Sequence, residues 1–223
     1  MGWYSNMDME LARANMIESQ VRTWDVLDQK VLDVLAQVKR EDFVPPAHRG
    51  LAFVDMEIPL GHGETMLCPK LEARLTQELG LSPTDRVLEV GTGSGYQAAL
   101  LSRLCAHVYT VDVVEEFCEG ARRKYAARGI GNVTVETGNA AEGWARHGPY
   151  DAILLTGSVG RLADELRRQL APGGRLLAVV GRAPIMTAQL ITCTAPGTYR
   201  SEGLFETCIA PLKLAREPER FVF

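Results

Sequence analysis

The segment 91–95 reads Gly-Thr-Gly-Ser-Gly, and an acidic residue lies on each side of it along the chain. Glycines allow a backbone to turn sharply and to approach a ligand without a clash at Cβ. Glu89 stands just before this segment, and Asp112 lies 21 residues after Gly91. A carboxylate at that distance accepts hydrogen bonds from both hydroxyls of a ribose. The spacing therefore predicts a nucleoside site built from the glycine segment and Asp112.

The spacing of the glycines favours one class of nucleoside over another. A dinucleotide fingerprint, G-x-G-x-x-G, needs its third glycine where this chain has Tyr96. A pyrophosphate would also be repelled by Glu89, whereas a ligand carrying an ammonium and a sulfonium would be attracted to it. These features predict S-adenosylmethionine as the cofactor, and they disfavour a nicotinamide enzyme.

The pattern from residue 86 onward predicts the elements that hold this segment in place. Short apolar runs predict strands at 86–90, 108–111, 133–135, 152–155 and 176–180, and helices are expected between them at 96–104, 115–128 and 163–170. Continuous apolar runs separated by helices are typical of parallel strands buried on both faces. We therefore predict an α/β fold with a Rossmann-like, doubly wound sheet. Two later strands, at 187–194 and 204–210, should pair antiparallel at one edge.

The first 80 residues predict helices that precede the sheet. Asp8 is a candidate cap for a helix through residue 21, and Asp25 for a second helix. The apolar face of the second helix is expected to comprise Leu27, Val31, Val34, Leu35 and Val38. We divide the chain into a helical lobe and cleft-bordering loop at 1–80 and a cofactor-binding core at 81–223, which together form one compact unit.

Composition excludes several classes of function. The chain has 223 residues, 46% of them hydrophobic, and 24 Lys and Arg against 28 Asp and Glu, for a net charge of −4. This balance argues against a nucleic-acid partner. No apolar run is long enough for a membrane helix, and no secretory signal is visible at the start. Five scattered cysteines without metal spacing predict reduced thiols in the cytoplasm and no metal site.

Three segments of the chain resemble one family of enzymes. Residues 89–99, Glu-Val-Gly-Thr-Gly-Ser-Gly-Tyr-Gln-Ala-Ala, resemble the first motif of the protein-L-isoaspartate O-methyltransferases. Residues 58–69, Ile-Pro-Leu-Gly-His-Gly-Glu-Thr-Met-Leu-Cys-Pro, are similar to that family's I-G-x-G-Q-T-I-S-x-P segment. Residues 138–144, Gly-Asn-Ala-Ala-Glu-Gly-Trp, are similar to its G-D-G-x-x-G-W. The resemblance extends from about residue 10 to about residue 212 of this chain.

The resemblance implies a fold, an activity and a set of site residues. The fold would have a seven-stranded sheet, and the enzyme would use S-adenosylmethionine to methylate the α-carboxyl of L-isoaspartyl residues in damaged polypeptides. Glu64, Thr65, Met66 and Leu67 would border cofactor and acceptor, with Thr65 and Leu67 at catalytic positions. The other cofactor-binding positions would be Glu89, Gly91, Gly93, Ser94 and Gly95 for the amino-acid end, Asp112 and Val113 for the ribose and adenine, and Asn139 and Ala140 for the adenine.

This chain departs from the family pattern at the acceptor and adenine positions. Leu67 stands where the family has its active-site serine, and Lys213 replaces a threonine found in some members. Asn139 and Ala140 replace an aspartate and a glycine. Two alternatives therefore stay open, namely a methyltransferase with a different acceptor and a cofactor-binding protein without catalysis. The sequence does not predict the oligomeric state. The basic cluster at 122–124 with Arg128 is expected to be a solvated helix face.

Overall fold

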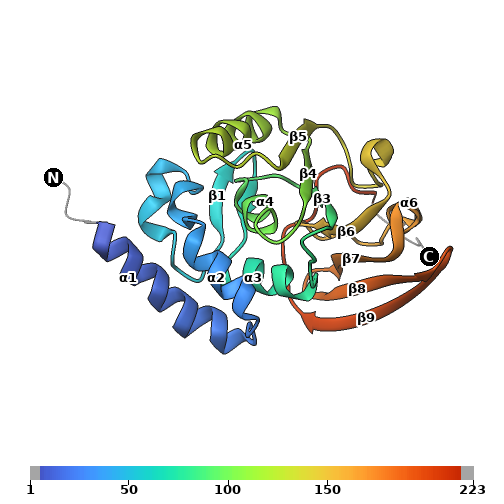
Figure 1. The fold of residues 1–223 in the computed structure, drawn as a ribbon, viewed down its shortest axis with the longest axis horizontal. Helices are drawn as coiled ribbons and strands as arrows, with labels where there is room; N and C mark the ends of the chain where they lie inside the picture. Colours follow the sequence, from blue (N-terminus) through green and yellow to red (C-terminus); the bar gives the residue numbers. More distant parts are fainter. Residues whose placement is uncertain (1–5, 217–223) are drawn as a thin grey trace, which may run out of the picture.

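Apolar runs form the strands of a central sheet in the computed structural model of the chain, which describes residues 6–216 (Figure 1). In these residues the sheet has seven strands in the order β5-β4-β3-β6-β7-β8-β9. The bounds are β3 (Arg86–Val90), β4 (His107–Asp112), β5 (Val133–Thr137), β6 (Tyr150–Leu155), β7 (Leu170–Arg182), β8 (Ile185–Ala195) and β9 (Thr198–Glu206). A separate hairpin is formed by β1 (Ile58–Gly61) and β2 (Glu64–Met66). The predicted α/β fold with a mostly parallel seven-stranded sheet is confirmed.

The topology creates a crevice at the centre of the sheet. Strands β5, β4, β3, β6 and β7 are parallel. The chain runs outward from β3 to β4 and β5, and then returns to place β6 on the other side of β3. Ligands of open α/β sheets bind where the strand order reverses in this way, at the carboxyl ends of the strands. The carboxyl end of β3 is therefore the place at which the fold positions a site.

The last two strands pair antiparallel at one edge, as predicted, but β9 lies earlier in the sequence than expected. It spans Thr198–Glu206 instead of 204–210. Gly197, with φ of 75°, closes a tight turn directly after β8, so that β9 begins at once. Most of β9 is polar and exposed, which hides it from a search for apolar runs.

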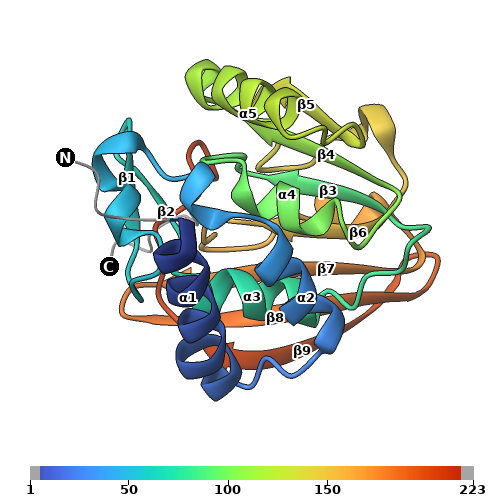
Figure 2. The same ribbon diagram turned by 60° about the vertical axis from the view of Figure 1, so that its left-hand side comes forward.

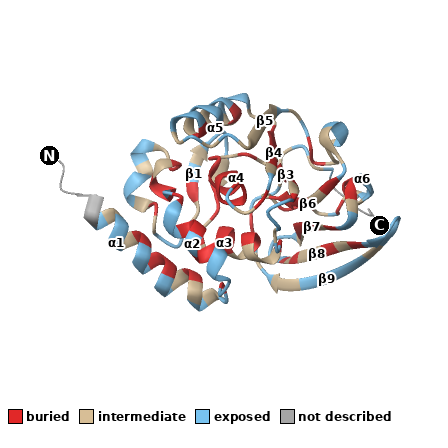
Figure 3. Cartoon of the chain, in the orientation of Figure 1, coloured by how far each residue is buried: buried red, intermediate tan, exposed pale blue. Residues whose placement is uncertain are grey.

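Helices cover both faces of the sheet. Their bounds are α1 (Asn6–Met16), α2 (Gln29–Gln37), α3 (Pro69–Glu78), α4 (Tyr96–Leu101), α5 (Glu115–Ala127) and α6 (Asp164–Arg168). Side chains alternate across each strand, so Val87 packs into the apolar cluster that includes α2, α3 and α4, whereas Leu88 packs into the cluster that includes α6. Figure 2 shows the N-terminal helices in front of the sheet, and Figure 3 shows the buried residues concentrated on the strands and on α4.

The N-terminal helices form, but their expected caps are wrong. Asp8 lies inside α1, which starts at Asn6 and continues into a π-helical turn at Ile17–Val21. The N-cap of α2 is Asp28, whose side chain accepts a hydrogen bond from the backbone N–H of Lys30, whereas Asp25 adopts a left-handed conformation three residues earlier. Leu27 consequently precedes the helix and is 67% exposed instead of packing with the apolar face.

Candidate active site

The glycine segment forms the turn between β3 and α4, and its backbone conformation requires glycine. Gly91, Gly93 and Gly95 have φ values of 100°, 48° and 83°. Asp112 at the end of β4 is tied to this turn, since its Oδ2 accepts a hydrogen bond from the Gly93 N–H at 2.9 Å. Its Oδ1 accepts one from the Val114 N–H, also at 2.9 Å. The carboxylate is thus held in a fixed position, and each oxygen keeps a lone pair for a ligand.

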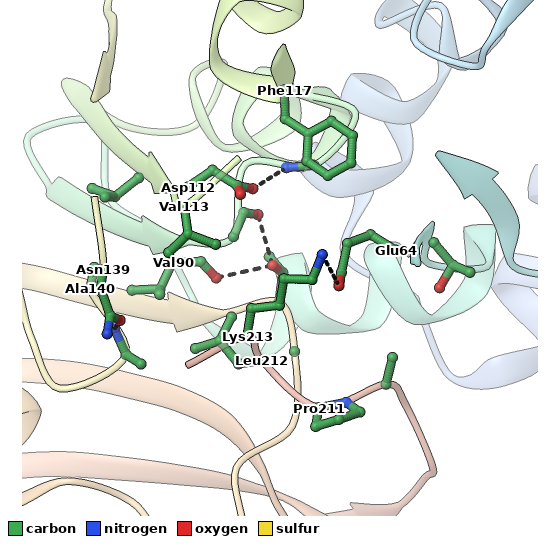
Figure 4. A pocket seen from close by; sticks show the side chains of 18 of the residues that line it. Glu64, Val90, Asp112, Val113, Phe117, Asn139, Ala140, Pro211, Leu212 and Lys213 are labelled. Atoms are coloured by element: carbon green, nitrogen blue, oxygen red, sulfur yellow. Dashed lines mark hydrogen bonds and ion pairs between the residues drawn. The ribbon is translucent and has the colours of Figure 1, made fainter. Parts of the chain in front are cut away.

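A cleft of about 640 Å³, counting the part open to solvent, lies at the carboxyl ends of β3, β4 and β6. In Figure 4, Asn139 and Ala140 lie at one end of the cleft, Glu64 at the other, and Asp112 between them. Nine of the predicted site residues line it: Glu64, Thr65, Leu67, Gly91, Gly93, Asp112, Val113, Asn139 and Ala140.

Four predicted site residues lie elsewhere. Met66 and Ser94 line a smaller adjoining cavity, which shares Thr65, Leu67 and the glycine turn with the cleft. Gly95 lies on the far side of the turn, where a Cβ would come within 2.9 Å of the Tyr125 hydroxyl. Glu89 is fully buried beneath the turn and belongs to neither lining. The structure therefore brings most of the predicted site together and places Glu89 and Gly95 behind it.

Glu89 is a buried carboxylate with an elevated pKa. Its Oε2 accepts a hydrogen bond from the Thr110 hydroxyl, and its Oε1 has no partner. The pKa of Glu89 is raised to about 8, chiefly by burial; the Thr110 hydroxyl opposes this rise, and the nearby Asp112 carboxylate adds a smaller contribution to it. The side chain is therefore mostly protonated at neutral pH when the cleft holds no cation.

We expect replacement of Glu89 by glutamine to change how stability depends on pH. The unfolded chain releases the Glu89 proton near pH 4.5 and the folded chain near pH 8, so the stability of the wild type falls as pH rises through this window. The glutamine of Glu89→Gln does not titrate. As pH rises through this window, the free energy of unfolding of the variant should therefore increase relative to that of the wild type by up to about 1.4 kcal/mol per pH unit. Urea unfolding at about pH 5 and about pH 8 measures this difference, and a pH-independent gap contradicts it.

Thr156 and Phe117 also line the cleft, although the sequence analysis did not identify them. Thr156 follows β6, and its hydroxyl lies 2.7 Å from the Gly91 carbonyl oxygen, to which it donates. Its position directly after a strand that neighbours β3 could have identified Thr156 from the sequence, because the ends of adjacent parallel strands meet at the same edge of the sheet. Phe117 lies in the first turn of α5, and no sequence pattern marks it.

The basic cluster on α5 is only partly the solvated face that was expected. Arg122 and Arg123 are exposed, but Lys124 is mostly buried and donates hydrogen bonds to the carbonyl oxygens of Ser94 and Phe43 at 2.8 and 2.9 Å. The pKa of Lys124 is lowered to about 8, chiefly by burial and to a smaller extent by the neighbouring arginines. Arg128 forms an ion pair with Asp42. This end of the helix therefore joins the glycine turn to the segment that carries Asp42 and Phe43.

A buried ion pair fixes the segment that carries Leu67. Arg40, which is 0% exposed, pairs with Glu72 of α3 and donates a hydrogen bond from Nη2 to the Leu67 carbonyl oxygen at 2.6 Å. Its guanidinium also lies over the ring of Tyr96, 5.1 Å from the centroid, in the helix that follows the glycine turn. Burial lowers the pKa of Arg40 to about 10, which leaves it charged at neutral pH. Arg40 thus couples the segment that carries Leu67 to the helix that follows the glycine turn.

One end of the cleft holds Asn139 in a defined orientation. Its Oδ1 accepts a hydrogen bond from the Ala141 N–H at 3.0 Å, and the backbone N–H of Gly138 donates to the Asp112 carbonyl oxygen.

Among residues 6–216, no helix has the length and apolar character required to cross a membrane.

Comparison with known proteins places the chain in a family. The profile described as Protein-L-isoaspartate(D-aspartate) O-methyltransferase (PCMT) matches residues 12–210. The chain is similar to protein-L-isoaspartate O-methyltransferase 2 of Pelobacter propionicus, with 41% identity over 92% of each chain. It is also similar to the protein-L-isoaspartate O-methyltransferase of Roseiflexus sp. strain RS-1, with 40% identity over 92% of this chain and 94% of the other.

Solved structures agree with this placement. A protein-L-isoaspartate O-methyltransferase structure superposes with a TM-score of 0.78 and 25% identity, covering 91% of this chain and 66% of the other. A Plasmodium falciparum protein, described as a putative protein-L-isoaspartate O-methyltransferase in complex with S-adenosyl-L-homocysteine, has the same fold, with a TM-score of 0.77, 20% identity, and coverage of 92% and 98%. The profile match spans most of the chain, and the chain therefore belongs to the protein-L-isoaspartate(D-aspartate) O-methyltransferase family.

Proposed function

We propose that this protein uses S-adenosylmethionine to methylate the α-carboxyl of L-isoaspartyl residues in damaged polypeptides, in the cytoplasm. The observation that carries the proposal is the placement of Asp112 and the glycine turn in one cleft with the Glu64–Leu67 segment. The first pair suits the nucleoside of a methyl donor, and the second borders the space left for an acceptor. Family membership supports both the donor and the acceptor.

The residues present fit the cofactor. Gly91 contributes backbone to the cleft lining, and only glycine fits at this position, since a Cβ would meet the Thr156 hydroxyl at 2.2 Å. Asp112 offers a carboxylate to the ribose hydroxyls, and Val113 and Ala140 offer apolar contacts to the adenine. Asn139 Oδ1 retains one lone pair for the adenine amino group. Glu89 precedes Thr92 by 3 residues and is buried beneath the turn. Its carboxyl group would lose its proton and become negatively charged when a sulfonium and an ammonium lie above the turn.

The chemistry requires positioning more than proton transfer. When bound, the cofactor supplies an electrophilic methyl group. An α-carboxyl is already ionised at neutral pH, so it needs no general base. In keeping with this, no histidine or cysteine is among the described residues that line the cleft. Holding the carboxylate oxygen in line with the methyl carbon contributes up to about 7–11 kcal/mol to rate enhancement.

The test is transfer of labelled methyl groups to a matched pair of peptides that differ only in an isoaspartyl or an aspartyl linkage. We expect label in the isoaspartyl peptide as a base-labile ester and none above background in the aspartyl peptide. Binding of S-adenosylhomocysteine without transfer to the isoaspartyl peptide would reject the proposed acceptor. It would favour a non-catalytic binding role if other peptides and small acids also stayed unlabelled.

One observation favours a second candidate, a methyltransferase for a different acceptor. Leu67 places hydrocarbon in the cleft lining at the position of the family serine, and only 7% of it is exposed. We expect Leu67→Ser to change isoaspartyl turnover by no more than about tenfold, since one neutral hydrogen bond is worth about 0.5–1.5 kcal/mol. Initial rates on the isoaspartyl peptide measure this. An inactive wild type together with an active Leu67→Ser variant would establish that the acceptor has diverged.

A further inference from the structure

The described residues at the proposed acceptor end of the cleft offer few free side-chain hydrogen-bond donors. The Thr65 hydroxyl donates to Glu57 Oε2 at 2.8 Å, and the Thr156 hydroxyl donates to backbone carbonyls. Leu67 contributes no polar side-chain atom, and its carbonyl oxygen is occupied by Arg40. An acceptor carboxylate entering this space would therefore find the hydroxyl protons already committed.

The charges that line the cleft would also oppose an anionic acceptor. Glu64 and Asp112 both line it, and Lys213 is the one cationic side chain among the described lining residues. A carboxylate that loses part of its hydration without a cationic or hydrogen-bonding partner incurs a large free-energy penalty. An acceptor with a negative charge therefore needs Lys213 or a second source of positive charge.

Lys213 is held in a fixed position facing this space. Its Nζ donates a hydrogen bond to the His62 carbonyl oxygen at 2.5 Å and lies 3.1 Å from Glu64 Oε1. An ammonium has three donors, so one remains after these two contacts. Figure 4 shows the Lys213 side chain reaching across the cleft toward Glu64, and its exposed fraction of 36% leaves the ammonium accessible.

The contacts of Lys213 are made to the hairpin that carries the acceptor-side residues. His62 stands at the hairpin turn with a left-handed φ of 54°, and its ring packs edge-on against Phe117, another residue of the cleft lining. The hairpin is thereby anchored on one side to α5 and on the other to Lys213. The ammonium therefore joins the hairpin to the chain after β9.

We propose that Lys213 is a specificity-determining residue that binds the α-carboxylate of the acceptor through its third N–H, and this rests on the proposed function. The ammonium holds one carboxylate oxygen while the other faces the methyl donor. That second oxygen forms a bond to the methyl carbon as the carbon–sulfur bond breaks, with the electron pair remaining on sulfur and no proton transferred. The product ester is neutral, so it loses the ionic contact with Lys213. It therefore dissociates from the cleft more readily than the unmethylated acceptor does.

The test compares two peptides that differ only at the isoaspartyl α-carbonyl, one with a carboxylate and one with a carboxamide. Binding of each is measured by calorimetry in the presence of S-adenosylhomocysteine. We expect the wild type to bind the carboxylate at least about tenfold more tightly, because a hydrogen bond to a charged group is stronger than a neutral one. Lys213→Met should bind both peptides with equal affinity. Its KM for the carboxylate peptide, which is the methyl acceptor, should rise by about 10- to 100-fold with a smaller change in kcat.

Two further variants separate recognition from a structural role. Lys213→Arg keeps the charge and should retain the preference for the carboxylate. Lys39→Met removes a lysine that pairs with Glu10 at 3.2 Å and is 52% exposed, and it should behave as the wild type. The affinity of Lys213→Met for S-adenosylhomocysteine should stay within about twofold of the wild type, well below the tenfold that 1.4 kcal/mol represents.

The outcomes distinguish this inference from the proposed function. A wild type that methylates the isoaspartyl peptide while Lys213→Met keeps the carboxylate preference overturns the role of Lys213 alone. The role is also overturned if Lys213→Met loses affinity for S-adenosylhomocysteine and for both peptides to the same extent. Such a result would mean that Lys213 stabilises the hairpin and does not recognise the carboxylate. A wild type that transfers no methyl group to the carboxylate peptide overturns the proposed function, and the inference with it.

Discussion

Replacing Arg40 by methionine is expected to lower the free energy of unfolding by about 3–5 kcal/mol, as for other buried ion pairs that lose one partner. The variant leaves the Glu72 carboxylate, which is 3% exposed, without its partner. It also removes the hydrogen bonds to the carbonyl oxygens of Leu67 and Ala52. Urea unfolding measures the loss, and the affinity for an isoaspartyl peptide should fall as well, because the Leu67 segment is no longer held.

Two comparisons make the Arg40 prediction specific. Removing both charges, in Arg40→Met with Glu72→Leu, should recover much of the lost stability, because no buried charge then stays unpaired. Arg49→Met is the matched control, since Arg49 is 56% exposed and pairs with Asp42 at 3.3 Å, and exposed pairs are worth about 0–1 kcal/mol. A loss below about 1 kcal/mol for Arg40→Met would mean that Glu72 finds another partner.

Replacing Gly91 by alanine is expected to weaken S-adenosylhomocysteine binding by at least about 100-fold. The φ of 100° is strained for alanine, and the new Cβ would lie 2.2 Å from Thr156 Oγ1. That hydroxyl is held by its hydrogen bonds to the Val90 and Gly91 carbonyl oxygens, so relief of the contact requires the turn or the end of β6 to shift. Either shift displaces the backbone on which the cofactor would lie. Calorimetric titration with S-adenosylhomocysteine measures the loss.

A matched glycine variant separates the steric contact from the backbone strain. Gly129 follows α5 with φ of 63°, and nothing lies within 4 Å of the Cβ that alanine would add. Gly129→Ala should therefore cost only the strain, of order 1–3 kcal/mol in stability, with no loss of cofactor affinity. Equal cofactor affinity in Gly91→Ala and Gly129→Ala would show that the turn does not form the binding surface.

The placement of Asp112 beside the glycine turn was predictable from the sequence because its signals are local. The glycine turn follows a buried strand, and Asp112 is the last residue of the next one, so parallel topology alone brings them to the same edge of the sheet. The departure from expectation at Glu89 has a physical reason. Side chains alternate along a strand, and at β3 the alternation places this carboxylate under the turn instead of above it.

The contacts that hold the acceptor side were not predictable, because they join distant parts of the chain. Arg40 and Glu72 lie in separate helical turns of the N-terminal lobe, and Arg40 shows no pattern that distinguishes it from a surface residue next to Lys39 and Glu41. Lys124 sits in a basic run that is typical of a solvated face, and only tertiary packing buries it. The pairing of Lys213 with Glu64 spans most of the chain.

A crystal structure with S-adenosylhomocysteine and an isoaspartyl peptide bound together would test the proposed arrangement of donor and acceptor. We expect the ribose against Asp112, the adenine beside Asn139, and the isoaspartyl α-carboxylate facing the thioether sulfur from the side of Leu67 and Lys213. A nucleoside bound outside this cleft would contradict it. So would a peptide whose α-carboxylate points away from the sulfur while the enzyme is active in solution.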